Sequence, residues 1–85
     1  MSYGVRINIF FKDGVFDPAA STTKDALNRL EIGNFSDLRI GKLIELQVAA
    51  SSPEEATSAA TNACKKLLAN EVMEKFSIES VTELQ

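Results

Sequence analysis

An α+β fold in one small domain is what this sequence predicts, and three observations lead to it. Short stretches in which hydrophobic and polar residues alternate occur in four places, each with the length of a strand. Two further stretches have the residue spacing of a helix, and each begins with a proline behind a polar residue. The chain has 85 residues, which is enough for one domain.

The first strand is predicted from Val5 to Phe11, because every second residue there is aliphatic or aromatic. Phe10 interrupts its polar side. Asp13-Gly14 is expected to end the strand. Asp17-Pro18 then predicts a helix start, with an acidic cap before a proline, and Thr22 with Asp25 offers a second possible start.

The first helix is expected to bury one stripe of side chains against the sheet. Its members fall at i, i+3, i+4 and i+7: Thr23, Ala26, Leu27 and Leu30. Gly33 is expected to end the helix with a positive φ, which glycine adopts without a steric penalty.

The stretch from Phe35 to Ala49 is too long for one flat strand, and its alternation changes phase at Gly41-Lys42. A phase change at a glycine is typical of a turn or a bulge. We therefore expect two strands joined by a tight hairpin at Gly41-Lys42.

The second helix is predicted to begin at Ser52-Pro53, with Ser52 as the cap and Glu55 completing a capping box. Asn70 is expected to end it. Its buried stripe consists mostly of alanine, which allows a close approach to the sheet: Ala56, Ala59, Ala60, Ala63, Cys64 and Leu67. The last strand is predicted around Phe76 and Ile78, with a possible extension to Val81.

The resulting order, β-α-β-β-α-β, predicts a ferredoxin-like split sandwich over residues 1–85. In that fold a four-stranded antiparallel sheet carries both helices on one face. The other face stays uncovered, and Phe10 and Leu43 are expected on it among polar residues. Such a mixed face suits contact with another protein or a second copy.

Composition excludes several functions. The net charge of −3 argues against a surface for nucleic acids or anionic membranes. The chain contains no histidine, so a Ser-His or Cys-His nucleophile pair cannot form, and no catalytic residue is assigned. One cysteine, Cys64, excludes an internal disulfide and a usual zinc site, and we expect it to be a core residue. A lone thiol with neither a targeting segment nor a membrane span predicts a cytoplasmic protein.

Two features have both a structural and a functional interpretation. Val15 and Phe16 lie in a connection, where they either cover the core or form a docking loop. Arg39 and Lys42 flank the predicted hairpin turn in an otherwise acidic chain. They are either a solvated tip or a contact with a partner or an anionic ligand, because guanidinium and ammonium groups pair with carboxylate or phosphate.

Three motifs resemble one family. Residues 12–18, KDGVFDP, resemble its K-x-G-V-x-D-P, and residues 37–46, DLRIGKLIEL, resemble V-R-I-G-K-x-I-E-L. Residues 64–70, CKKLLAN, resemble C-x-K-L-L-A-N. This family is PurS, the small subunit of bacterial and archaeal phosphoribosylformylglycinamidine synthase. Ala19 and Glu71 depart from its pattern, which often has a glycine soon after D-P and a proline after L-A-N.

The resemblance implies a non-catalytic subunit of a ligase in purine biosynthesis. In the split enzyme a large subunit uses ATP and Mg²⁺, a glutaminase subunit releases ammonia, and PurS holds them together and supports ammonia transfer. A homodimer or higher oligomer is implied, with no cofactor or metal bound by this chain.

The resemblance and the two cations also predict contact residues: Arg39, Gly41 and Lys42, with Asp17 and Pro18 in a second contact loop. Two alternatives share the element order. A sensor of the ACT type would bind small molecules near the first strand-helix loop. An RNA-recognition domain would need stacking aromatics on its central strands, and Phe10 alone does not supply them.

Overall fold

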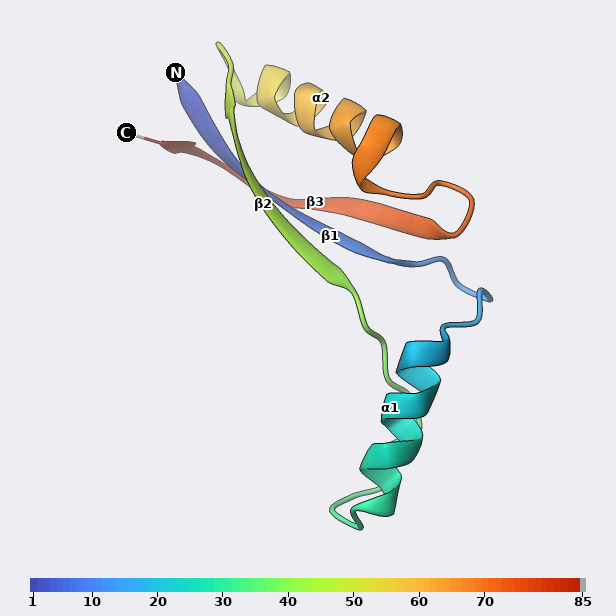
Figure 1. Ribbon diagram of the computed structural model, residues 1–85. Coiled ribbons are helices and arrows are strands. Elements are labelled where there is room, and N and C mark those ends of the chain that lie inside the picture. The colour runs from blue at the N-terminus through green and yellow to red at the C-terminus, as the bar shows by residue number, and fades with distance from the viewer. Residues whose placement is uncertain (85) are drawn as a thin grey trace.

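A three-stranded antiparallel sheet forms the body of the protein in this computed structural model, which describes residues 1–84. The strands are β1 (Ser2–Phe11), β2 (Lys42–Ala49) and β3 (Glu74–Leu84), and β1 lies in the centre. The helices are α1 (Pro18–Arg29) and α2 (Pro53–Ala63), and a π-helical turn, η1 (Cys64–Leu68), continues α2. Of these two helices, α2 lies over the sheet and α1 does not (Figure 1).

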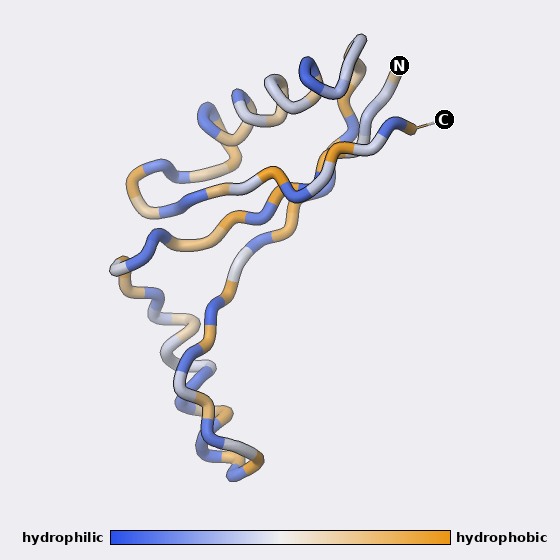
Figure 2. The backbone as a smooth tube through the Cα atoms, turned by 180° about the vertical axis from the view of Figure 1, so that it is seen from behind, coloured by the Kyte–Doolittle hydropathy of each residue, from blue (hydrophilic) through white to orange (hydrophobic). Residues whose placement is uncertain are grey.

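The core lies between the sheet and α2. Val5, Ile7 and Ile9 of β1 are fully buried, and Ala60 and Cys64 pack against them. Figure 2 shows the alternation of hydrophobic and hydrophilic residues along the strands that places one side chain in two on this face. The predicted close approach of an alanine-rich helix is therefore confirmed at Ala56 and Ala60, and Cys64 is a core residue as expected. Ala59, which was predicted in the same buried stripe, is exposed.

The predicted four-stranded ferredoxin-like sandwich is wrong in its strand number and in the position of its first helix. No strand forms from residue 34 to residue 41; this segment runs extended beside α1 and then enters β2. Gly41-Lys42 is thus not a hairpin turn, because β2 pairs with β1 in the register Asn8↔Leu43 and Val5↔Leu46. The change of phase marks the place where the chain enters the sheet.

We call residues 18–41 the arm, because α1 and the segment that returns from it project away from the sheet (Figure 1). The expected stripe of α1 is not buried by the body. Leu30 is 64% exposed, Leu27 is half-buried, and only Ala20 of this helix is buried. The radius of gyration is 16.4 Å, whereas a compact chain of this length would have about 12 Å.

Several local predictions are confirmed and others are corrected. Asp17 caps α1, Pro18 occupies its first turn, and Ser52 caps α2 through the Glu55 amide at 3.1 Å. The Glu55 carboxylate, however, accepts a bond from the Ser51 hydroxyl and does not complete the capping box. The positive φ after α1 belongs to Glu31, at 56°, and not to Gly33. Two hydrogen bonds between the Asn28 side chain and the Phe35 backbone close the turn that follows.

Leu67 is a further correction. The helical stripe placed it in the core, but it is 83% exposed. The π-helical turn explains this, since the bond from the Ala69 amide to the Cys64 carbonyl spans five residues and rotates the side chains between them.

Candidate functional site

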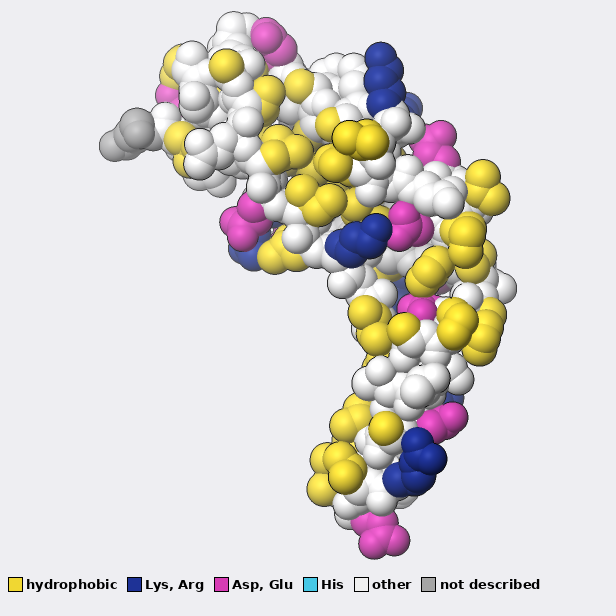
Figure 3. All heavy atoms as spheres, viewed as in Figure 1, with side chains coloured by type: hydrophobic (Ala, Val, Ile, Leu, Met, Phe, Trp, Pro, Cys, Tyr) yellow, Lys and Arg dark blue, Asp and Glu magenta, His cyan; other side chains and the backbone are white. Residues whose placement is uncertain are grey.

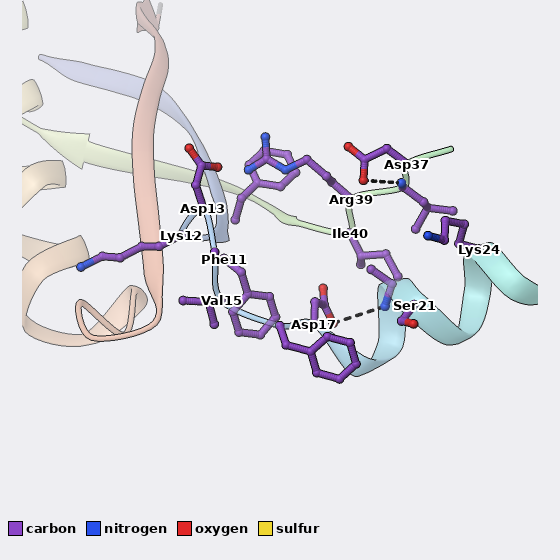
Figure 4. Close-up of a pocket in the computed structure, with 15 residues that line it drawn as sticks. Phe11, Lys12, Asp13, Val15, Asp17, Ser21, Lys24, Asp37, Arg39 and Ile40 are labelled. Atoms are coloured by element: carbon purple, nitrogen blue, oxygen red, sulfur yellow. Dashed lines mark hydrogen bonds between the residues drawn. The ribbon is translucent and has the colours of Figure 1, made fainter. Parts of the chain in front are cut away.

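A cleft of about 380 Å³ lies where the arm joins the sheet (Figure 4). Residues 10–17 form one side of it, and the first turns of α1 with residues 37–40 form the other. The cleft exists because the chain crosses from the sheet to the arm twice, once through the loop after β1 and once through the segment before β2. The predicted contact residues lie at these two crossings.

Asp17 and Pro18 stand at the first crossing, where they start α1. One carboxylate oxygen of Asp17 accepts hydrogen bonds from the Ala19 and Ala20 amides at 3.1 and 3.3 Å. A cap of this kind satisfies amides that have no partner inside the helix, and it fixes the direction in which the helix leaves. Asp17 lines the cleft and is half-buried, and Pro18 is exposed.

Arg39 and Gly41 stand at the second crossing. The Arg39 guanidinium lies over the Phe10 ring, with its central carbon 4.8 Å from the ring centroid. Gly41 passes so close to β1 that a Cβ atom there would lie 2.4 Å from the Phe10 ring and 2.8 Å from the Ile9 carbonyl oxygen. Phe10, the residue that interrupts the polar side of β1, therefore anchors the returning segment. Its position in the sequence pattern did not indicate this function.

Lys42 forms an ion pair with the sheet. Its ammonium lies 3.4 Å from the Glu74 carboxylate, on the far side of β1 from β2. Glu74 also accepts the Asn70 amide at 2.8 Å. That hydrogen bond, with Lys42 nearby, holds the pKa of Glu74 below its usual range in spite of partial desolvation. Periodicity could not reveal this pair, because its members are 32 residues apart in different elements.

The structure thus brings Asp17 and Arg39 to one cleft, and it places Gly41 and Lys42 just beyond its lining. The two loop hydrophobes differ. Val15 is half-buried in the cleft, but Phe16 is 71% exposed, so covering the core does not explain Phe16. The docking interpretation of this loop stays a hypothesis.

The charges of the cleft favour contact over catalysis. Three cations line it, Lys12, Lys24 and Arg39, and Figure 4 shows the Lys12 side chain extending away from its centre. Its acids already have partners: Asp13 pairs with Lys75, Asp17 caps α1, and Asp37 accepts the Leu38 amide. Within residues 1–84, no three His, Cys, Asp or Glu side chains gather to bind a metal ion.

Cys64 is the free thiol, and as the first residue of η1 it is fully buried in the core between α2 and the sheet. Burial raises the pKa of this thiol, which disfavours the nucleophilic thiolate. None of the helices among the described residues is long and apolar enough to span a membrane.

Comparison with known proteins gives one consistent result. The family model for PurS, described as phosphoribosylformylglycinamidine (FGAM) synthase, matches residues 4–82. The phosphoribosylformylglycinamidine synthase subunit PurS of Synechocystis sp. is 36% identical over 84 residues, which cover 99% of this chain and 83% of the relative. The subunit of that name from Bacillus subtilis is 34% identical over 77 residues, or 91% of this chain and 90% of the relative.

Solved structures agree. Thermus thermophilus PurS has a TM-score of 0.86 at 30% identity, and the match covers 100% of both chains, arm included. A chain in the structure of PurLQS from Thermotoga maritima has a TM-score of 0.86 at 29% identity, with 93% of this chain and 96% of that chain covered.

Proposed function

The chain belongs to the PurS family, and from this premise we propose that it serves as the small subunit of a phosphoribosylformylglycinamidine synthase in purine biosynthesis. The observation that carries the proposal is the family match over residues 4–82, which includes all or most of every element of the fold. All relatives and structures named above are PurS chains or the PurLQS complex, which favours the subunit over a sensor of the ACT type.

In this proposal the chain bridges a synthetase subunit and a glutaminase subunit and supports the passage of ammonia between them. The likeness to a chain of PurLQS from Thermotoga maritima supports such an assembly. The ATP and Mg²⁺ of the ligase reaction belong to the large subunit, and the complex works in the cytoplasm. This chain contributes surfaces, because the charged groups Asp17, Arg39 and Lys42 at the two crossings are engaged in capping, stacking and an ion pair.

Reconstitution tests this function. The synthetase and glutaminase subunits are purified alone, and amidine formation is measured with glutamine or with ammonium as the nitrogen source. We expect glutamine-dependent activity to require the chain and ammonium-dependent activity to need it much less. Equal glutamine-dependent activity with and without the chain would refute the bridging function.

The contact residues remain Arg39, Gly41 and Lys42, with Asp17 and Pro18. Their positions at the two crossings support this choice, because a partner that held both crossings would also fix the arm. Arg39→Glu is the sharpest variant, since Lys42 is already paired with Glu74. It should weaken assembly about 10-fold or more, as the loss of an interface arginine does. Arg29→Glu, which reverses a charge at the other end of α1, is the control.

The arm also supports a homodimer. The apolar side of α1 finds no cover in its own body, and oligomerisation is a usual way for a small chain to bury such a surface. A second copy that covers Leu27 and Leu30 would complete the core that the sequence pattern of α1 predicts.

A further inference from the structure

One row of hydrophobic side chains on β2 has only a partial cover. Ile44, Leu46 and Val48 lie opposite inward-facing residues of β1 in the antiparallel register, so they share the face of the sheet that α2 covers. Their partners on β1 are at most 3% exposed, whereas all three residues of the row are half-buried. We call these three residues of β2 the open row.

The open row follows from the width of a single helix. An α-helix with its side chains is about 10–12 Å wide and neighbouring strands lie about 4.8 Å apart, so one helix covers about two strands. The sheet has three strands, and α2 lies nearer to β3 than to β2. Figure 3 shows hydrophobic side chains that reach the surface between α2 and the sheet. A surface for a second helix therefore remains beside α2, over β2.

The arm carries a surface of the matching kind. Leu27 is half-buried, Leu30 is 64% exposed and Ile32 is 69% exposed, and we call these three residues the arm stripe. The helix α1 has 12 residues and is about 18 Å long, whereas the open row extends over about 13 Å of β2. One α1 is thus long enough to cover one open row.

The arm is held away from the open row of its own chain. Gly41 packs against the Phe10 ring and Arg39 stacks on the same ring, so this joint fixes an arm that projects outward (Figure 1). Exchange of an identical element between two copies is a low-cost route to a dimer. A second copy therefore offers the surface that the arm does not reach on its own body.

The exposed area of the chain has the size that such an exchange would bury. The chain exposes 5971 Å², whereas a compact protein of 9.3 kDa exposes about 5,000 Å². The excess of about 1,000 Å² is close to the roughly 800 Å² that each partner contributes to a standard interface. In a two-fold dimer each copy gives one arm and receives one, so both surfaces are covered in both copies.

We propose that two copies of the chain exchange their arms, so that the arm stripe of each copy covers the open row of the other. This inference rests on the homodimer of the proposed function and names the surface that covers α1. It also places the two crossings at the border between the copies, because the chain passes there from one body to the other.

Complementation between two damaged chains tests the exchange. Leu27→Ser/Leu30→Ser damages the arm stripe, and Ile44→Ser/Leu46→Ser damages the open row. Leu43→Ser is the matched control, because Leu43 is a 49% exposed hydrophobe on the opposite face of β2. Sedimentation equilibrium of each variant, and of an equimolar mixture of the two double variants, measures dimerisation. Circular dichroism reports folding.

We expect each double variant to raise the dimer dissociation constant about 10-fold or more, as the loss of two interface side chains does. Leu43→Ser should stay within about 3-fold of the wild type, as expected outside an interface. The mixture should dimerise about 3-fold or more tighter than either double variant alone. The reason is that a mixed dimer keeps one contact between an intact arm stripe and an intact open row.

Cross-linking keeps the test decisive if the variant of the open row does not fold. A chain with Leu30→Cys is mixed with a chain that carries Ile44→Cys, and a short bismaleimide is added. Cys64 is buried, so it should not react. We expect a covalent link between the two chains, and much less of it when Leu43→Cys replaces Ile44→Cys.

The proposal is overturned if the folded variant of the open row dimerises like the wild type, or if the mixture is no tighter than its components. Equal cross-linking of Leu30→Cys to Leu43→Cys and to Ile44→Cys would also overturn it. Wild-type chain that stays monomeric would refute the homodimer together with the exchange. Reconstitution with glutamine tests the subunit function separately, so its failure would leave an observed exchange of arms intact.

Discussion

Gly41 shows how a single missing side chain positions the arm. Its backbone passes close to the Phe10 ring and the Ile9 carbonyl oxygen. A Cβ atom at this position would lie closer to both than Cβ atoms in real proteins do. The Phe10 ring in turn supports the Arg39 guanidinium. At the scale of the residue, the motif Arg39-Ile40-Gly41-Lys42 is therefore a joint between arm and sheet, whatever partner it also contacts.

Gly41→Ala should destabilise the protein by about 1–3 kcal/mol, because the methyl group forces β1 and the returning segment apart. Urea denaturation measures this free energy of unfolding. Gly33→Ala is the control, since its Cβ would meet only the Phe35 ring, at 3.3 Å, and Gly33 has no positive φ. Equal stability of the two variants would contradict the close approach at Gly41.

Glu74 makes stability depend on pH. Its pKa is lowered in the folded protein by the Asn70 amide and by Lys42. A carboxyl with a lowered folded pKa adds stability above its unfolded pKa, about 4.3, and that contribution disappears as the pH falls through the folded value. Glu74→Gln should cost about 1 kcal/mol at pH 7 and clearly less near pH 3. Urea denaturation at both pH values checks this, and a cost that stays the same at pH 3 would contradict it.

At the scale of the element, the sequence predicted best where the determinants are local. The caps at Asp17 and Ser52 and the alternation along β1 depend on neighbouring residues, and all three were predicted correctly. The stretch from Phe35 to Ile40 alternates like a strand, but strand formation needs a partner, and no strand of this chain pairs with it within residues 1–84. Leu67 was predicted to be buried because the helical stripe was drawn with 3.6 residues per turn. The π-helical turn changes this spacing, and the sequence pattern does not reveal such a turn.

The alanines of α2 give a prediction at the same scale. Ala60 is 1% exposed and packs against β1, so Ala60→Leu would overfill the space between helix and sheet. We expect a loss of about 1–3 kcal/mol in the free energy of unfolding. Ala59→Leu, one residue away on the exposed side of α2, should change stability by less than about 0.5 kcal/mol. Thermal and urea denaturation of both variants measure the difference, and equal losses would contradict the packing described for α2.

At the scale of the whole molecule, the sequence of one chain specifies the sheet and its cover by α2, but it does not specify what covers the arm. The principal extents are 51, 29 and 14 Å, so the chain is far from the compact shape that burial within one copy favours. The predicted sandwich assumed that each helix covers the sheet of its own chain. The pattern of α1 is genuine, but it cannot specify whether its own body or another molecule covers it.

A second copy is the cover that the homodimer proposal assigns to α1, and it can be removed by mutation. Leu27→Ser/Leu30→Ser should leave the body intact, because neither side chain belongs to its core. The variant should shift the chain toward monomer by about 10-fold or more in dissociation constant, since each apolar side chain lost from an interface costs about 1–3 kcal/mol. Sedimentation equilibrium measures this shift. Asp25→Asn, an exposed change on the same helix, should leave self-association unaltered. If the serine variant associates like the wild type, α1 is not the dimer surface, and a larger subunit becomes the better candidate for covering the arm.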